Sequence, residues 1–97
     1  MLILRTLARG GPLHGFAIAD FIQETSENVL QVEEGSLYPA LQRMLIKGWI
    51  VGDWGRTQEN RRARYYKLTR DGRQQLEREL ERYDRVAFAI ARVLKPA

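Results

Sequence analysis

The segment from residue 36 to residue 47 combines cationic, amide and hydroxyl side chains with an apolar stripe at helical spacing. At about 100° per residue, Leu37, Leu41 and Met44 fall on one arc of a helix. The opposite arc carries the side chains that could do chemistry, together with the start of the helix: Ser36, Tyr38, Pro39, Gln42, Arg43 and Lys47. Arg and Gln can form paired hydrogen bonds with purine edges, and Ser and Lys suit phosphates. The segment predicts a recognition helix for double-stranded DNA, although an ordinary amphipathic surface helix fits this stretch alone about equally well.

The basic residues are grouped along the chain. Residues 36–69 contain seven basic and two acidic residues, a net charge of +5, whereas residues 10–35 contain five acidic residues and no Lys or Arg. Positive charge gathered on one segment is what a polyanion-binding surface requires. We expect Arg61, Arg62 and Arg64 to contact phosphates or a minor groove. The alternative is a flexible charged loop with no partner.

The first third of the chain has the pattern of two helices followed by an extended link. Apolar residues at helical spacing predict helices over residues 2–9 and 15–25, separated by Gly10-Gly11-Pro12. Residues 29–32 are expected to form a short extended link, with a single strand as an alternative. With the helix over 36–47, this order is a helix-turn-helix arrangement with a long central connection.

Two short strands are predicted after the recognition helix. Residues 50–54 and 64–68 are rich in β-branched and aromatic side chains, and residues 55–62 between them have loop composition. Alternation places Tyr66 and Leu68 on one side of the second strand. Two strands closed by a basic loop directly after a recognition-type helix form a wing.

A single long helix is predicted from residue 70 to about residue 95, with Thr69 as its N-cap. Its apolar residues alternate four and three positions apart, which is a heptad seam suited to a helical partner. The seam consists of Leu76, Leu80, Tyr83, Ala87, Ile90 and Leu94. Val86, Ala89 and Val93 add a second stripe. We expect a second subunit to cover these residues and form a homodimer; the alternative is a helix that packs entirely on its own domain.

The composition argues against several classes of function. The chain of 97 residues has no cysteine and a single histidine, His14, so we expect no metal site. His14 is interpreted as a hydrogen-bonding group at a helix start or as a phosphate contact. We find no catalytic pair or phosphate loop, and expect neither an enzyme nor a cofactor. No uncharged run approaches the ~20 residues of a membrane span, which favours a cytoplasmic protein with no membrane partner.

Five short motifs resemble the PadR family of bacterial transcriptional regulators in order and spacing. They are Gly11-Pro12-Leu13-His14-Gly15-Phe16, Gly35-Ser36-Leu37-Tyr38-Pro39-Ala40-Leu41, Gly48-Trp49-Ile50, Arg61-Arg62-Ala63-Arg64-Tyr65-Tyr66 and Leu68-Thr69-Arg70-Asp71-Gly72-Arg73. The resemblance implies a winged-helix DNA-binding domain, one C-terminal dimerisation helix and repression at palindromic operators. The single helix is similar to the short branch of the family, which includes multidrug-responsive repressors. A small-molecule effector is therefore among the partners that the resemblance implies.

The chain departs from this family in two respects. Its first helix is short at the front, and its terminal helix lacks the Trp that frames a drug pocket in some short members. The expected organisation is a mainly α protein with a two-stranded wing. Residues 1–69 would form the winged helix-turn-helix DNA-binding domain and residues 70–97 the dimerisation helix. The competing hypothesis is a winged-helix protein–protein interaction module without DNA affinity.

Overall fold

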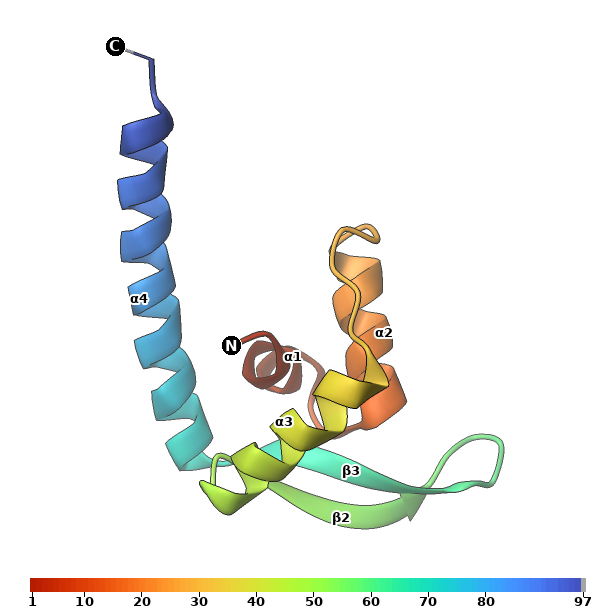
Figure 1. Cartoon of the computed structure of the whole chain (residues 1–97). Helices are drawn as coiled ribbons and strands as arrows, with labels where there is room; N and C mark the ends of the chain where they lie inside the picture. The colour runs from red at the N-terminus through yellow and green to blue at the C-terminus, as the bar shows by residue number, and fades with distance from the viewer. Residues whose placement is uncertain (97) are drawn as a thin grey trace.

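Four helices and three short strands follow one another in the computed structural model, which describes residues 1–96 (Figure 1). In chain order they are α1 (Leu2–Gly10), β1 (Leu13–His14), α2 (Gly15–Thr25), α3 (Glu34–Ile46), β2 (Ile50–Arg56), β3 (Arg62–Leu68) and α4 (Arg70–Leu94). This is the predicted winged helix-turn-helix with a long terminal helix. Ala97, the last residue of the expected dimerisation helix, lies outside the described residues.

The core forms where the apolar stripes of the helices meet the base of the sheet. The largest fully buried side chains are Leu4, Ile18, Leu41 and Ile50, one each from α1, α2, α3 and β2. Burying an aliphatic side chain contributes about 1.5–3 kcal/mol relative to leaving it exposed. Each of the first three helices therefore has one face fixed by this shared core.

The sheet has three strands, whereas the sequence predicted a wing of two. Its order is β1-β3-β2, all antiparallel, and Leu13 pairs with Tyr66 while His14 pairs with Tyr65. A strand of two residues has no periodicity, so only the pairing with β3 reveals it. The wing strands also extend further than predicted, to Arg56 and from Arg62.

The alternative of a strand over residues 29–32 is wrong. The chain there bends back on the end of α2, where the backbone N–H of Leu30 donates to the Ser26 hydroxyl (3.0 Å) and that of Val29 to the Ser26 carbonyl (3.1 Å). These hydrogen bonds are local, and no strand lies beside this segment to form a ladder with it.

The end of α3 is joined to the start of α4 through Gly48 and Thr69. Gly48 has a left-handed φ of 75°, which is typical of a helix C′ residue, and the N–H of Trp49 donates to the Met44 carbonyl (3.0 Å). The Thr69 hydroxyl donates to the Gly48 carbonyl (2.6 Å) and accepts from the N–H of Gly72 (3.0 Å). One side chain thus caps α4 and holds it against the end of the recognition-type helix.

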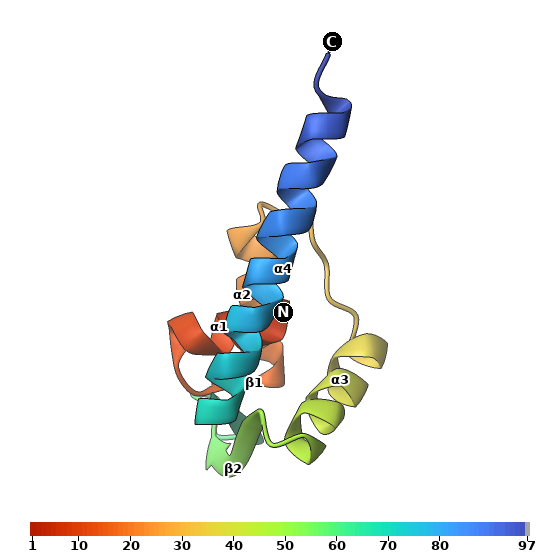
Figure 2. The same cartoon turned by 90° about the vertical axis from the view of Figure 1, so that its left-hand side faces the viewer.

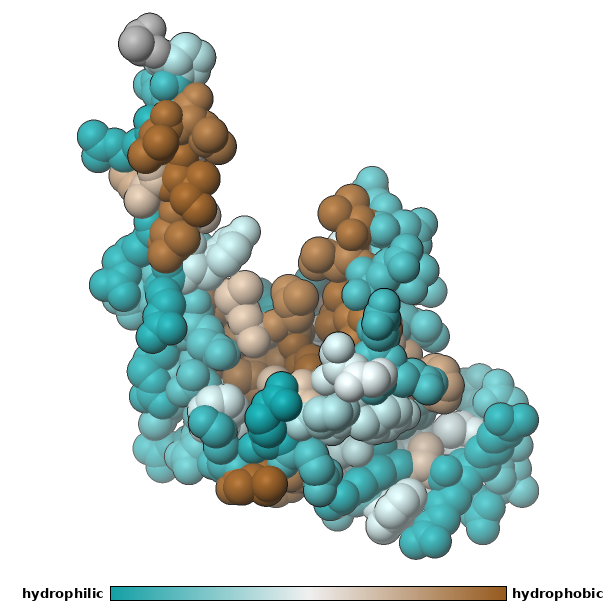
Figure 3. Space-filling view, viewed as in Figure 1, coloured by the Kyte–Doolittle hydropathy of each residue, from teal (hydrophilic) through white to brown (hydrophobic). Residues whose placement is uncertain are grey.

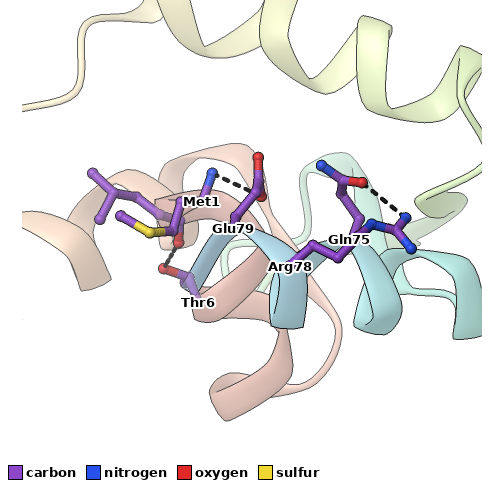
Figure 4. A network of polar contacts seen from close by, with 6 residues as sticks. Met1, Thr6, Gln75, Arg78 and Glu79 are labelled. Carbon is purple, nitrogen blue, oxygen red and sulfur yellow. Dashed lines mark hydrogen bonds and ion pairs between the residues drawn. The ribbon is translucent and has the colours of Figure 1, made fainter. Parts of the chain in front are cut away.

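The first turns of α4 pack on the domain, and the remainder projects away from it. Leu76 is 5% exposed and belongs to the core, and Leu80 is half-buried against it. The Met1 ammonium group lies 3.5 Å from a carboxylate oxygen of Glu79, which links α1 to α4 (Figure 4). Both views show the C-terminal half of α4 extending beyond the rest of the molecule (Figures 1 and 2). The alternative that α4 packs entirely on its own domain is therefore wrong for this chain.

None of the helices formed by residues 1–96 combines the length and the apolar character that a bilayer-crossing segment needs.

Thr69→Ala should lower the free energy of unfolding by about 2 kcal/mol, because it removes both the N-cap bond and the bond to Gly48. Thr69→Ser keeps the hydroxyl and is the matched control, with an expected loss below about 0.5 kcal/mol. Urea unfolding followed by circular dichroism measures both. Equal stability of the Ala and Ser variants would contradict this account of the α3–α4 junction.

Candidate nucleic-acid interface

The two faces of α3 differ as the sequence predicted. Leu37 and Leu41 are 2% and 1% exposed and face the core. The side chains on the other side are all exposed: Ser36, Tyr38, Pro39, Gln42, Arg43 and Lys47. The free face of α3 therefore presents two cations, one amide and two hydroxyl groups.

The helix begins at Glu34, two residues before the predicted start. Glu33 is the N-cap residue and forms no side-chain cap bond. Pro39 consequently lies beyond the first turn, where it removes the N–H that would bond to the carbonyl of Gly35. Both residues are exposed, so water can satisfy that carbonyl.

Tyr38 joins the free face of α3 to the start of α2. Its side chain is 43% exposed, yet its ring covers Gly15, where a Cβ would lie 2.9 Å from the Tyr38 hydroxyl oxygen and 3.1 Å from a ring carbon. Tyr38 thus packs at the edge of the core while part of its side chain faces solvent.

His14 is the N-cap residue of α2. Its Nδ1 accepts a hydrogen bond from the N–H of Ala17 (3.2 Å), and its ring meets Tyr65 edge-on at 5.4 Å. The interpretation of His14 as a helix-start group is confirmed. Since Nδ1 is engaged in the cap, Nε2 is the atom that remains available to a phosphate.

The arginines of the wing do not form one cluster. Arg61 and Arg62 are exposed near the hairpin end, and the Arg62 guanidinium lies over the ring of Trp54, 4.3 Å from its centroid. Arg64 is half-buried and runs back toward the base of the sheet, with its Cζ 5.9 Å from the centroid of the Tyr66 ring. Two cations therefore lie near the tip of the wing and one nearer the base of the sheet.

Trp54 is a feature that the sequence did not identify as part of the site. Its side chain is 62% exposed. Trp54 pairs with Arg64 across the strands, which makes Arg62 its diagonal neighbour. Only the register of the wing strands shows that the Arg62 guanidinium can stack on this indole.

A groove of about 860 Å³ lies between the wing and the start of α2. Tyr38 and His14 line one side, and Trp54, Arg62 and Arg64 line the other. The lining includes three arginines against Asp20 and Glu59, so the groove is mildly cationic. In the space-filling view, the part of the molecule formed by α3 and the wing is mostly hydrophilic (Figure 3). Residues 1–96 contain no group of three His, Asp or Glu side chains able to hold a metal ion.

Tyr66 forms part of the floor of this groove. Burial raises the pKa of its phenol, Arg64 opposes the shift because a cation favours phenolate, and Tyr38 adds to it. Tyr66 therefore stays a neutral aromatic surface beneath the guanidinium of Arg64.

Comparison with known proteins identifies the family. The model described as "Transcriptional regulator PadR-like family" matches residues 3–78, so the chain belongs to this family. A curated relative, the "Uncharacterized 37.1 kDa protein in transposon TN4556" of Streptomyces fradiae, is 39% identical over 93% of this chain. The chain spans 24% of the length of that relative.

Solved structures share the fold. A transcriptional regulator from Clostridium thermocellum has a TM-score of 0.86 at 24% identity, covering 97% of this chain and 90% of that one. A PadR family transcription regulator from Clostridium difficile has a TM-score of 0.81 at 28% identity, covering 97% and 95%. Bacillus subtilis PadR, solved with operator DNA, has a TM-score of 0.70 at 26% identity, covering 81% of this chain and 44% of that one.

Proposed function

We propose that this member of the PadR-like family is a homodimeric, sequence-specific DNA-binding regulator that represses transcription at a palindromic operator. The observation that carries the proposal is the free face of α3, with its polar side chains exposed opposite Leu37 and Leu41. Residues 1–69 would be the DNA-binding unit and residues 70–97 the dimerisation helix. The protein would act in the cytoplasm, where it meets DNA.

In this proposal α3 enters the major groove. Gln42 and Arg43 lie on its exposed face and can read purine edges, and Lys47 at the far end suits a phosphate. Ser36 in the first turn can donate to a phosphate through its hydroxyl, since its backbone N–H already bonds to the Glu33 carbonyl (3.0 Å). Bacillus subtilis PadR, which matches over 81% of this chain, was solved with operator DNA, and this supports the proposal that the present chain binds DNA.

The wing would contact the DNA backbone beside the major groove. Arg61 and Arg62 are exposed near its tip, and stacking on Trp54 orients Arg62 while leaving its N–H groups free. The His14 Nε2 atom at the start of α2 is a further candidate phosphate contact. Cations at these positions would supply affinity for any duplex, and α3 would supply the preference for the operator.

The second subunit would cover the C-terminal half of α4. Apolar residues gather there and around the end of α2, facing each other across open space (Figure 3). Of the predicted seam, Leu76 and Leu80 are occupied by the core of their own domain. The free seam is therefore Tyr83, Ala87, Ile90 and Leu94, and Val86 and Val93 lie beside it. Such a row of exposed apolar residues is costly in water and is suited to a partner helix.

This arrangement would also account for repression and its control. A dimer would place its two α3 helices about one DNA turn apart, or a multiple of it, matching a palindrome. A bound dimer would block access to the DNA it covers. A small-molecule effector that enters the dimer interface would relieve repression by changing the spacing of the two α3 helices.

Arg43→Ala should weaken operator binding by about tenfold or more and reduce the preference for operator over random DNA, because one base contact is lost. Arg85→Ala is the matched control, since Arg85 is an exposed arginine on α4 far along the chain from α3 and the wing. Fluorescence anisotropy with both duplexes measures the two affinities. If Arg43→Ala leaves both affinities at the wild-type level, α3 is not the reading element.

Ile90→Glu should convert the dimer to monomers, because it introduces a charge into the free seam. Phe88→Glu is the matched control: Phe88 is 66% exposed on the same stretch of helix but on the other side of its circumference. Sedimentation velocity distinguishes the species. A dimer that persists in Ile90→Glu, or is lost in Phe88→Glu alone, would place the interface elsewhere.

A further inference from the structure

The side chain of Arg64 is more enclosed than those of the other arginines on the wing. Its side chain is half-buried, and its Nε is shielded from solvent with no hydrogen-bond partner among residues 1–96. No carboxylate within that range lies at ion-pair distance from it. A buried N–H left unpaired is destabilising, so its presence calls for an explanation.

Gly52 is what makes this position possible. A Cβ at Gly52 would lie 2.5 Å from the Arg64 Nε, 3.1 Å from its Cζ and 3.2 Å from its Cδ. Gly52 does not have a positive φ, so its backbone conformation is open to other residues. Glycine is therefore required at this position because any Cβ would occupy the space that the guanidinium of Arg64 fills.

The strand register defines the direction in which Arg64 runs. Trp54 lies directly opposite Arg64, whereas Gly52 lies opposite Tyr66, two residue pairs closer to the core. To cover Gly52, the Arg64 side chain crosses the sheet diagonally toward the core and away from the wing tip. It ends over Tyr66 while lining the groove that Tyr38 of α3 also lines.

We propose that Gly52 is a positioning residue that directs the guanidinium of Arg64 into this groove, where it binds a DNA backbone phosphate between α3 and the wing. The inference rests on the proposed function and adds a partner atom and the residue that selects it. With Nε enclosed against the sheet, the terminal N–H groups are the ones left for an acceptor, and a phosphate takes two of them at once.

A fixed guanidinium has a physical advantage over a mobile one. An arginine that is already held loses less conformational freedom on binding, so more of the interaction appears as affinity. When DNA is bound, this gain in binding free energy offsets the free-energy cost of leaving the Arg64 Nε–H unpaired. It also explains why the side chain is enclosed against the sheet in a segment whose other arginines are exposed.

The test uses the full chain and a random-sequence duplex, because a phosphate contact does not depend on base sequence. Affinity is measured over a salt series for the wild type, Gly52→Ala, Arg64→Ala and the double variant. Gly52→Ala and Arg64→Ala should each weaken binding about tenfold and reduce the salt slope by about 1 per subunit. In the Arg64→Ala background, Gly52→Ala should have no further effect, because both act through one group.

Gly55→Ala is the matched control. Gly55 is on the same strand but on the opposite face, where a Cβ would meet ring carbons of Tyr65 at 3.0 Å and no arginine. Its salt slope should equal that of the wild type. Circular dichroism checks folding, and Arg64→Ala tests the contact without any change at position 52.

An NMR measurement reports the position of Arg64 directly. The Arg64 Nε–H should exchange slowly in the wild type and in Gly55→Ala, and rapidly in Gly52→Ala. Wild-type affinity and salt slope in Gly52→Ala, or losses that add in the double variant, would overturn the inference while the proposed function stands. A wild type that binds no duplex would refute the proposed function, and the inference with it.

Discussion

The burial of Leu37 and Leu41 decides what the rest of this molecule can do. These two side chains anchor α3 in a core shared with α1, α2 and β2, so the helix cannot rotate about its axis without exposing them. The orientation of the polar face follows from that anchor. The same packing places Tyr38 over Gly15, and so fixes the recognition-type helix relative to the start of α2. A stable apolar contact thus determines which polar groups are available to a ligand.

A second constraint is that α4 is longer than the part of the domain on which it can pack. Only its first turns find apolar partners, through Leu76 and Leu80, and Thr69 ties its start to Gly48 at the end of α3. The remaining turns leave Ile90 and its neighbours exposed. The geometry of a partner bound there would be transmitted to α3 through this junction, because the hydrogen bond from the Thr69 hydroxyl to the Gly48 carbonyl joins the start of α4 to the end of α3.

Much of this structure could be predicted from the sequence, where a long periodic pattern or a defined cap was present. The helix over 15–25, the Thr69 cap and the apolar face of α3 are of this kind. The strand β1 was missed because two residues carry no period. The position of Leu76 was missed because a heptad seam has the same spacing whether it faces its own core or a partner. The return of Arg64 toward the core depends on the strand register and on Gly52, and neither can be read from charge alone.

The central claim is that the free face of α3 reads a DNA sequence. The most direct measurement compares the affinity of the purified protein for DNA from its own upstream region with that for random DNA, at two salt concentrations. The account predicts tight, salt-dependent binding with a clear preference for the upstream fragment. Equal and weak binding to both fragments would contradict it and leave only a basic surface, as expected of a winged helix that binds another protein.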